Sequence, residues 1–239
     1  MRLVLLGPPG AGKGTQAKQI QERYDLVHIS TGEAFRHIQS DPQHPLAKQV
    51  SLCVTKGNLL PDDVVMQVVK QRLQQSDCQK GYVLDGFPRT VEQAQLLQQF
   101  LVQEEQQLSC VLSFEVSCST LMKRLSNRLT CPECGTSYRW QGQQIPPGPH
   151  PKCDKDDHPL VRREDDEPQA IRRRLQVFDQ QTAPVKAFYS GCGLLHCVNA
   201  EGDVENVWRQ LQQQLERVGR SRDLASATKN CYKRNVYKT

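Results

Sequence analysis

Apolar positions along the chain follow two patterns that alternate. Short apolar runs of the kind found in buried strands occur at residues 2–6, 27–29, 82–84, 111–116 and 195–198. Apolar residues at helical spacing lie between and after these runs, at residues 15–24, 64–73, 94–101 and 204–215. Strands that alternate with helices predict an α/β fold, in which helices cover both faces of a parallel five-stranded sheet.

Two stretches interrupt this alternation. Residues 31–60 have the pattern of a helix-rich insertion. Residues 128–166 combine turn residues, three cysteines and a Pro-rich run at 145–151, with little periodicity. We expect both stretches to be excursions from the core. After Gly219 the pattern is lost, and we expect a poorly ordered tail.

The composition is that of a globular protein: of 239 residues, 37% are hydrophobic and 24% are charged. No apolar run approaches the roughly 20 residues that cross a bilayer, so no membrane association is expected. The apolar run at residues 3–6 is shorter than the roughly 7–15 residues of a signal-peptide core, which makes the cytoplasm the expected location. The net charge of +5 is that of segment 219–239, with six basic residues and one acidic residue, so it does not indicate a nucleic-acid-binding protein.

A glycine-rich loop follows the first predicted strand and precedes the first predicted helix. Its sequence is GPPGAGKGT, from Gly7 to Thr15. Such glycines let backbone N–H groups turn toward phosphate oxygens, and the N-terminus of the next helix adds positive potential. Lys13 adds a mobile charge for the β- and γ-phosphates of a nucleotide. The loop predicts nucleotide binding, and a GTPase is disfavoured because the chain lacks an Asn-Lys-x-Asp motif.

The end of the predicted strand at 82–84 carries a second group of polar residues, in the segment LDGFPRT. Asp85 emerges at the carboxyl edge of the sheet, where α/β proteins bind ligands, and its carboxylate can hold Mg²⁺ through water. The Arg89 guanidinium can bind a phosphate through two hydrogen bonds. Thr31 and Arg36, at the start of the first insertion, offer a further hydroxyl and guanidinium.

Three cysteines and an aspartate in the second insertion have metal-ligand spacing. Cys131 and Cys134 form a C-x2-C pair, and Cys153 forms a second pair with Asp156 at the same spacing. Three thiolates and one carboxylate suit a closed tetrahedral Zn²⁺ site, which is structural because four protein ligands leave no position for water. Asp156 is preferred as the fourth ligand for its spacing. The alternatives nearby are His150, Asp154, Asp157 and His158.

Taken together, these motifs resemble those of the adenylate kinase family. The matching segments are GPPGAGKGTQA, ISTGEAFR, LDGFPRTVEQA, RREDDE and TAPVKAFY, in family order, and the resemblance covers about residues 1–216. It implies a P-loop nucleotide kinase fold with a core domain at 1–29, 61–126 and 167–218, an AMP-binding insertion at 30–60, a zinc-binding lid at 127–166 and a basic, flexible tail at 219–239. Some family members, chiefly bacterial ones, carry the same cysteine pattern, although segment 140–152 departs here from the usual lid sequence.

The resemblance also assigns residues to two nucleotides. For ATP it implies Gly10, Ala11, Gly12, Lys13, Gly14, Thr15, Arg124, Arg128, Ser137, Tyr138 and Gly202. For AMP it implies Thr31, Arg36, Asn58, Leu59, Leu60, Gly86, Phe87, Pro88, Arg89, Gln93, Arg163 and Arg174, with Gln93 at the adenine edge. The implied catalytic residues are Lys13, Asp85, Arg89, Arg128, Arg163 and Arg174.

The implied activity is that of a nucleoside monophosphate kinase, which transfers the terminal phosphoryl group of MgATP to AMP and yields two ADP. Such catalysis depends mostly on positioning and on positive charge, which suits an arginine-rich site. Lid closure excludes water, so that AMP is the acceptor. The resemblance further implies a monomer, with Mg²⁺ bound together with ATP and structural Zn²⁺ in the lid.

Several alternatives stay open. A UMP/CMP kinase would share this core, although Thr90 and Gln93 favour AMP, and GTP could replace ATP as the donor. A nucleotide sensor would be expected to lack Lys13, Arg89 or Arg128, and all three are present. A nucleic-acid module built on the cysteine knuckle is disfavoured, since interleaved aromatic residues are missing.

Asp165 and Asp166 allow two interpretations at this point. They can pair with basic residues when the lid closes, or they can cap the start of the following helix.

Overall fold

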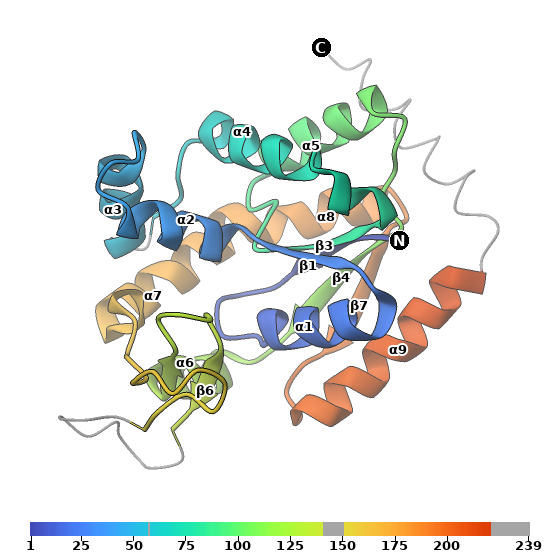
Figure 1. The fold of residues 1–239 in the computed structure, drawn as a ribbon. Helices are drawn as coiled ribbons and strands as arrows, with labels where there is room; N and C mark the ends of the chain where they lie inside the picture. The colour runs from blue at the N-terminus through green and yellow to red at the C-terminus, as the bar shows by residue number, and fades with distance from the viewer. Residues whose placement is uncertain (57, 141–150, 221–239) are drawn as a thin grey trace.

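A five-stranded sheet forms the centre of the protein (Figure 1). The computed structural model describes residues 1–56, 58–140 and 151–220. The strands are β1 (Arg2–Leu6), β2 (Val27–Ser30), β3 (Tyr82–Asp85), β4 (Cys110–Glu115) and β7 (Leu195–Asn199). They are all parallel, in the order β2-β3-β1-β4-β7. The predicted α/β fold with a parallel five-stranded sheet is therefore confirmed.

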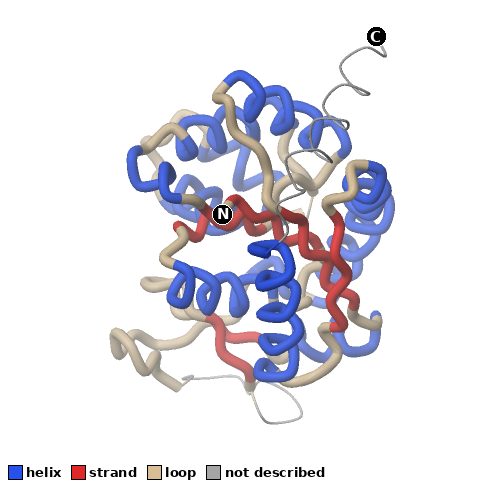
Figure 2. The backbone as a smooth tube through the Cα atoms, turned by 90° about the vertical axis from the view of Figure 1, so that its right-hand side faces the viewer, coloured by secondary structure: helices blue, strands red, loops and turns tan. Residues whose placement is uncertain are grey.

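Helices cover both faces of this sheet, as the two views of Figures 1 and 2 show. One face packs against α4 (Asp62–Leu73), α5 (Val91–Gln103) and α8 (Ala183–Gly191). The other face packs against α1 (Lys13–Tyr24) and α9 (Val204–Arg220). The alternation within β1 explains this division, because Val4 and Leu6 belong to the first apolar cluster and Leu3 and Leu5 to the second.

The first insertion folds into α2 (Thr31–Ser40) and α3 (Ala47–Thr55). The Ser30 side chain caps α2 by accepting a hydrogen bond from the Glu33 backbone N–H at 3.3 Å. Helix α6 (Cys118–Ser126) follows β4, and α7 (Pro168–Val177) precedes α8. Short 3-10 helices also occur at Ser76–Lys80 and Glu164–Asp166, and a single π-helical turn occurs at Phe178–Thr182.

The second insertion is more regular than its sequence suggests. It contains an antiparallel hairpin of β5 (Arg128–Thr130) and β6 (Ser137–Arg139). A small apolar cluster of Leu129, Cys131, Cys153 and Leu160 lies beside it. Strands of three residues are too short for alternation to stand out, which explains the lack of periodicity in this part of the sequence. The described helices include none that is long and apolar enough to cross a membrane.

Part of the predicted organisation lies outside the described residues. This holds for the lid segment 141–150 and for the basic tail from residue 221 onward.

Candidate functional site

The glycine-rich loop lies at the carboxyl edge of the sheet, between the end of β1 and the start of α1. Gly10 and Gly12 adopt positive φ angles of 85° and 91°, which L side chains rarely adopt. At Gly10 a Cβ atom would also come within 2.8 Å of Leu125 Cγ. The loop therefore needs glycine at both positions, and it presents its backbone to the space above the sheet.

Lys13 folds back over this loop. Its Nζ donates hydrogen bonds to the carbonyl oxygens of Gly7, at 2.8 Å, and Pro8, at 3.0 Å. Burial lowers the pKa of Lys13 to about 8, although the negative charge of Asp85 acts in the opposite direction. The ammonium group is thus held at a site where added negative charge would be favourable.

Asp85 ends β3 next to the loop, and its side chain is buried. Burial by itself would raise its pKa, but the contact with His28 and the charge of Lys13 outweigh burial and hold the pKa below its usual value. His28 Nε2 lies 3.5 Å from Asp85 Oδ2. His28 is not among the predicted site residues, and the structure brings it into contact with a predicted catalytic carboxylate.

Asp166 joins two of the predicted catalytic arginines, and its side chain is fully buried. Arg128 donates from Nε to Oδ2 at 2.7 Å and from Nη2 to Oδ1 at 2.6 Å, which is a bidentate pair. Arg174 Nη1 donates to Asp166 Oδ1 at 2.9 Å and lies 3.0 Å from Asp165 Oδ2. Of the two interpretations of these aspartates, pairing with basic residues is the one observed. The N-cap of α7 is Glu167, without a side-chain cap.

The remaining arginines of the site are affected by burial and by one another. Burial lowers the pKa of Arg89 to about 10, and repulsion from Arg174 adds to this effect. Burial likewise lowers the pKa of Arg163 to about 9, with repulsion from Arg128 next in size. For Arg36 the pKa is also lowered, mainly by burial. Guanidinium groups that repel one another in a buried site favour anionic ligands.

One cavity of about 690 Å³ connects these groups. This volume suits a small-molecule site, for which roughly 300–1,000 Å³ is typical. Its lining includes all the residues predicted for ATP and more than half of those predicted for AMP. These are Gly10, Ala11, Gly12, Lys13, Gly14, Thr15, Arg36, Leu59, Asp85, Gly86, Pro88, Arg89, Arg124, Arg128, Ser137, Tyr138, Arg163, Arg174 and Gly202.

Five predicted AMP residues are absent from the cavity lining. Four of them are buried behind the cavity wall, that is, behind the residues that line the cavity: Thr31, Leu60, Phe87 and Gln93. Thr31 Oγ1 donates a hydrogen bond to the Gly86 carbonyl oxygen at 2.9 Å. Asn58 Oδ1 accepts a hydrogen bond from Arg173 Nε at 3.2 Å. Thr31 thus braces Gly86, which does line the cavity.

Arg139, which was not among the predicted site residues, also lines the cavity. In the hairpin Arg139 pairs with Arg128, and its charge acts with burial to lower the pKa of Arg124. Because side chains alternate along a strand, Arg139 shares a face with the predicted residue Ser137. Tyr138, between them, lines the cavity as well, so both faces of this short strand contribute to the site. Lys18, Thr136 and Lys155 line the cavity too and were not predicted.

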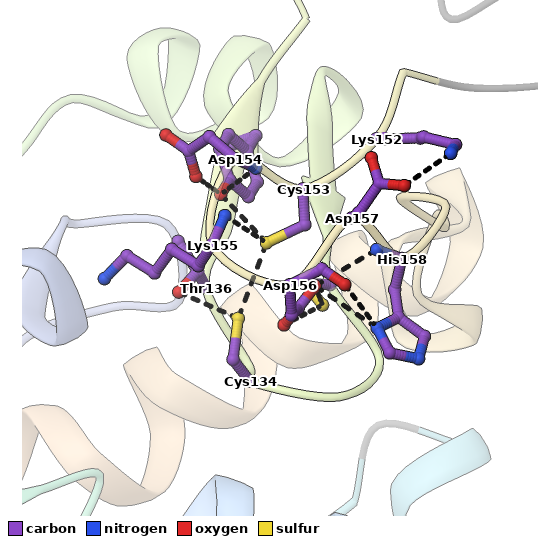
Figure 3. Close-up of polar contacts among 11 residues, drawn as sticks. Cys134, Thr136, Lys152, Cys153, Asp154, Lys155, Asp156, Asp157 and His158 are labelled. Atoms are coloured by element: carbon purple, nitrogen blue, oxygen red, sulfur yellow. Dashed lines mark hydrogen bonds and ion pairs between the residues drawn. The ribbon is translucent and has the colours of Figure 1, made fainter.

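The four predicted metal ligands come together in the second insertion. The ligand atoms of Cys131, Cys134, Cys153 and Asp156 all lie within 4.8 Å of one another. Figure 3 shows Cys134, Cys153 and Asp156 directed toward a common point. The Cys134 and Cys153 sulfurs are 3.6 Å apart, close to the spacing of about 3.8 Å that follows from Zn–S bonds of about 2.3 Å in a tetrahedron. Cys131 Sγ lies 3.2 Å from both Asp156 carboxylate oxygens.

The alternative fourth ligands have other partners. The Asp154 carboxylate accepts a hydrogen bond from the Tyr138 hydroxyl, and Asp157 pairs with Lys152 at 2.6 Å. His158 Nδ1 lies 3.0 Å from the backbone oxygen of Asp156, and His150 lies outside the described residues. The donor set thus fits Zn²⁺ with Asp156 in the fourth place.

Comparison with known proteins agrees with this geometry. Residues 5–194 match the protein family described as Adenylate kinase. The chain is 40% identical over 218 residues to an adenylate kinase of Archaeoglobus fulgidus, covering 91% of this chain and 99% of the relative. It is 40% identical over 216 residues to an adenylate kinase of Clostridium novyi, covering 90% and 99%. It is 42% identical over 205 residues to an adenylate kinase of Thermotoga neapolitana, covering 86% and 92%. This chain, with its phosphate loop and its buried arginine cluster, therefore belongs to the adenylate kinase family and is a nucleoside monophosphate kinase.

Proposed function

We propose that the protein catalyses the reversible transfer of the terminal phosphoryl group of MgATP to AMP, giving two ADP. The observation that supports this reaction best is the gathering of Lys13, Arg36, Arg89, Arg128, Arg163 and Arg174 at one cavity. The negative charge that spreads over a phosphoryl group in transfer is stabilised by such preorganised cations. An oxygen of the AMP phosphate attacks the γ-phosphorus in line, and the bond to the β–γ bridging oxygen breaks.

The two substrates occupy opposite ends of the cavity in this proposal. The loop at residues 10–15 binds the ATP phosphates, while Arg124 and Arg139 flank the donor base near Gly202. Arg36 and Arg89 bind the AMP phosphate, with the base toward Leu59 and Gln93. The residues named from the family resemblance keep these roles as proposals.

Mg²⁺ bound with ATP would neutralise charge on the phosphates. Asp85 suits this ion, since its carboxylate is buried beside the phosphate loop and its lowered pKa keeps it ionised. Zn²⁺ held by Cys131, Cys134, Cys153 and Asp156 would be structural, because its ligands are all protein groups. It would stabilise a segment whose own apolar cluster is small.

We further propose that residues 30–60 are the AMP-binding part, residues 127–166 the lid, and 1–29, 61–126 and 167–218 the core. Contacts between these parts favour closure around the substrates. Lys18 Nζ on α1 donates to Thr136 Oγ1 beside the metal cluster at 3.3 Å, and a Cβ at Gly135 would lie 3.5 Å from Glu33 Oε1 on α2. The proposed location is the cytoplasm, and the proposed state is a monomer.

A nucleotide-panel assay tests this function. ADP formation is followed with ATP and Mg²⁺ plus each of AMP, CMP, UMP and GMP, and again with GTP as the donor. We expect turnover with ATP and AMP, and a loss of at least 100-fold in Lys13→Ala and Arg89→Ala. Arg172→Ala, an exposed arginine on the same helix as Arg174, is the matched control and should keep full activity. ATP loss that does not depend on AMP would refute the proposal.

A further inference from the structure

The amide of Gln93 has its orientation imposed by its neighbours. Gln93 lies in the first turn of α5 and is only 1% exposed. Its Oε1 accepts a hydrogen bond from the Arg89 backbone N–H at 2.7 Å. Its Nε2 donates to Asp62 Oδ1 at 2.8 Å. Each end of the amide therefore faces a partner in a buried setting.

Neither partner can exchange roles. A backbone N–H can only donate, and an ionised carboxylate can only accept. If the Gln93 amide turned over, its NH2 group would face the Arg89 N–H and its oxygen would face the Asp62 carboxylate. Both hydrogen bonds would be lost inside the protein, where unmade polar contacts are costly.

Asp62 is itself anchored. It is the first residue of α4, and its second oxygen, Oδ2, accepts a hydrogen bond from Thr90 Oγ1 at 2.9 Å. Thr90 is the N-cap of α5, where Oγ1 accepts from the Gln93 backbone N–H at 3.0 Å. The carboxylate thus spans the starts of two helices and cannot rotate away from Gln93 without losing both bonds.

After these two bonds the amide has one further N–H and one further lone pair, which in this conformation lie behind the cavity wall. Adenine presents the complementary pair on its Watson–Crick edge, with the N6 amino group as donor and N1 as acceptor. Hypoxanthine and guanine present the reverse, with O6 as acceptor and N1–H as donor. We propose that Asp62 is a specificity-determining positioning residue, which selects adenine over 6-oxopurines in the acceptor nucleotide by locking the Gln93 amide. This inference rests on the proposed function, in which the wall beside Gln93 opens so that its amide contacts the base of AMP.

Asp62→Asn tests the proposal, with AMP and IMP as paired acceptors. Asparagine has the same shape but can accept or donate, so both orientations of Gln93 become possible. IMP differs from AMP at the Watson–Crick edge and lacks the extra 2-amino group of GMP. We expect the ratio of kcat/KM for AMP to that for IMP to fall at least tenfold. Asp63→Asn, the exposed neighbour in the same helical turn, should leave the ratio unchanged.

Both kcat/KM values are measured on the same sample, so a fraction of misfolded protein lowers them equally and leaves their ratio unchanged. If the wild-type protein does not phosphorylate AMP at all, the proposed function fails. If it does, and the Asp62→Asn ratio stays within twofold of the wild type, the inference about Asp62 is overturned.

A measurement on the wild-type protein covers the case in which Asp62→Asn does not fold. With AMP bound, both side-chain amide protons of Gln93 should exchange slowly with solvent in ¹⁵N NMR spectra, one on Asp62 and the other on the base. Fast exchange of both protons in the AMP complex would also overturn the inference.

Discussion

Asp166→Asn is the substitution for which the structure gives the most detailed expectation. The wild-type carboxylate is fully buried and binds Arg128 through two hydrogen bonds and Arg174 through a third. Asparagine keeps the shape but removes the charge, and its NH2 group would face a guanidinium. Arg128 would then lose its carboxylate partner, and Arg174 would keep only Asp165, within a crowded group of cations.

The size of the effect follows from burial. Removing one partner of a buried ion pair costs about 3–5 kcal/mol. The Arg128 and Arg174 side chains are 17% and 19% exposed, so water compensates in part, and we take the lower end, about 3 kcal/mol. For a protein of this size each kcal/mol lowers Tm by about 2–4 °C. We therefore expect Tm to fall by about 6–12 °C.

Activity should fall as well, because the same carboxylate orients two arginines proposed to stabilise the transferring phosphoryl group. A misplacement of about 1 Å in such a site can cost about 100-fold in rate. Bound phosphates would supply the missing negative charge to Arg128 and Arg174. The Tm deficit should accordingly become smaller when AMP and a non-hydrolysable ATP analogue are added.

The assay is differential scanning fluorimetry with and without these ligands, together with kcat for ADP formation. Glu164→Gln is the matched control, since Glu164 is exposed in the same turn, and it should behave as the wild type. Two results would refute the reasoning: a Tm within 2 °C of the wild type with normal kcat, or a deficit that the ligands leave unchanged.

Three other predictions concern separate parts of the protein. Because burial lowers the pKa of Lys13 to about 8, its ammonium form is lost as pH rises through 8, and kcat/KM for ATP should fall above that pH. The corresponding fall in kcat should occur at a higher pH. A kcat/KM that stays constant up to pH 9.5 would contradict this. The purified protein should contain one Zn²⁺ per chain by elemental analysis. Cys134→Ser should lower both the metal content and Tm. Cys118→Ser, at an exposed free thiol, should change neither. Arg139→Ala should raise KM for ATP about tenfold in steady-state kinetics and leave KM for AMP within twofold, and equal effects on both would argue against a role at the donor base.

The fold was predictable where burial leaves a strong pattern. A central strand such as β1 is apolar from Leu3 to Leu6 because both its faces are covered, and the helices between strands show one apolar side. The same reasoning located the phosphate loop, since Gly7 to Thr15 lies between a buried strand and a helix. The cysteine spacing also predicted the cluster at Cys131 and Asp156.

The remaining features depend on contacts between distant segments. Nothing in the local sequence links Asp62 to Gln93, 31 positions away, or Arg128 to Asp166, 38 positions away. The two interpretations of Asp166 could be separated only by its partners in space. Sequence patterns report which side of an element is buried, and they do not report which charged groups meet there.

The hairpin of β5 and β6 has a consequence for how its sequence can vary. Arg128 faces Arg139 across the two strands, and residues 131–136 form the turn between them. A slip of one residue would turn every side chain of a strand to its other face. Strands of three residues offer few ladder bonds to resist such a slip, so the length of the turn decides the alignment, as it does in β-hairpins generally. An insertion or deletion of one residue between 131 and 136 should therefore be tolerated less well than most substitutions at the same positions.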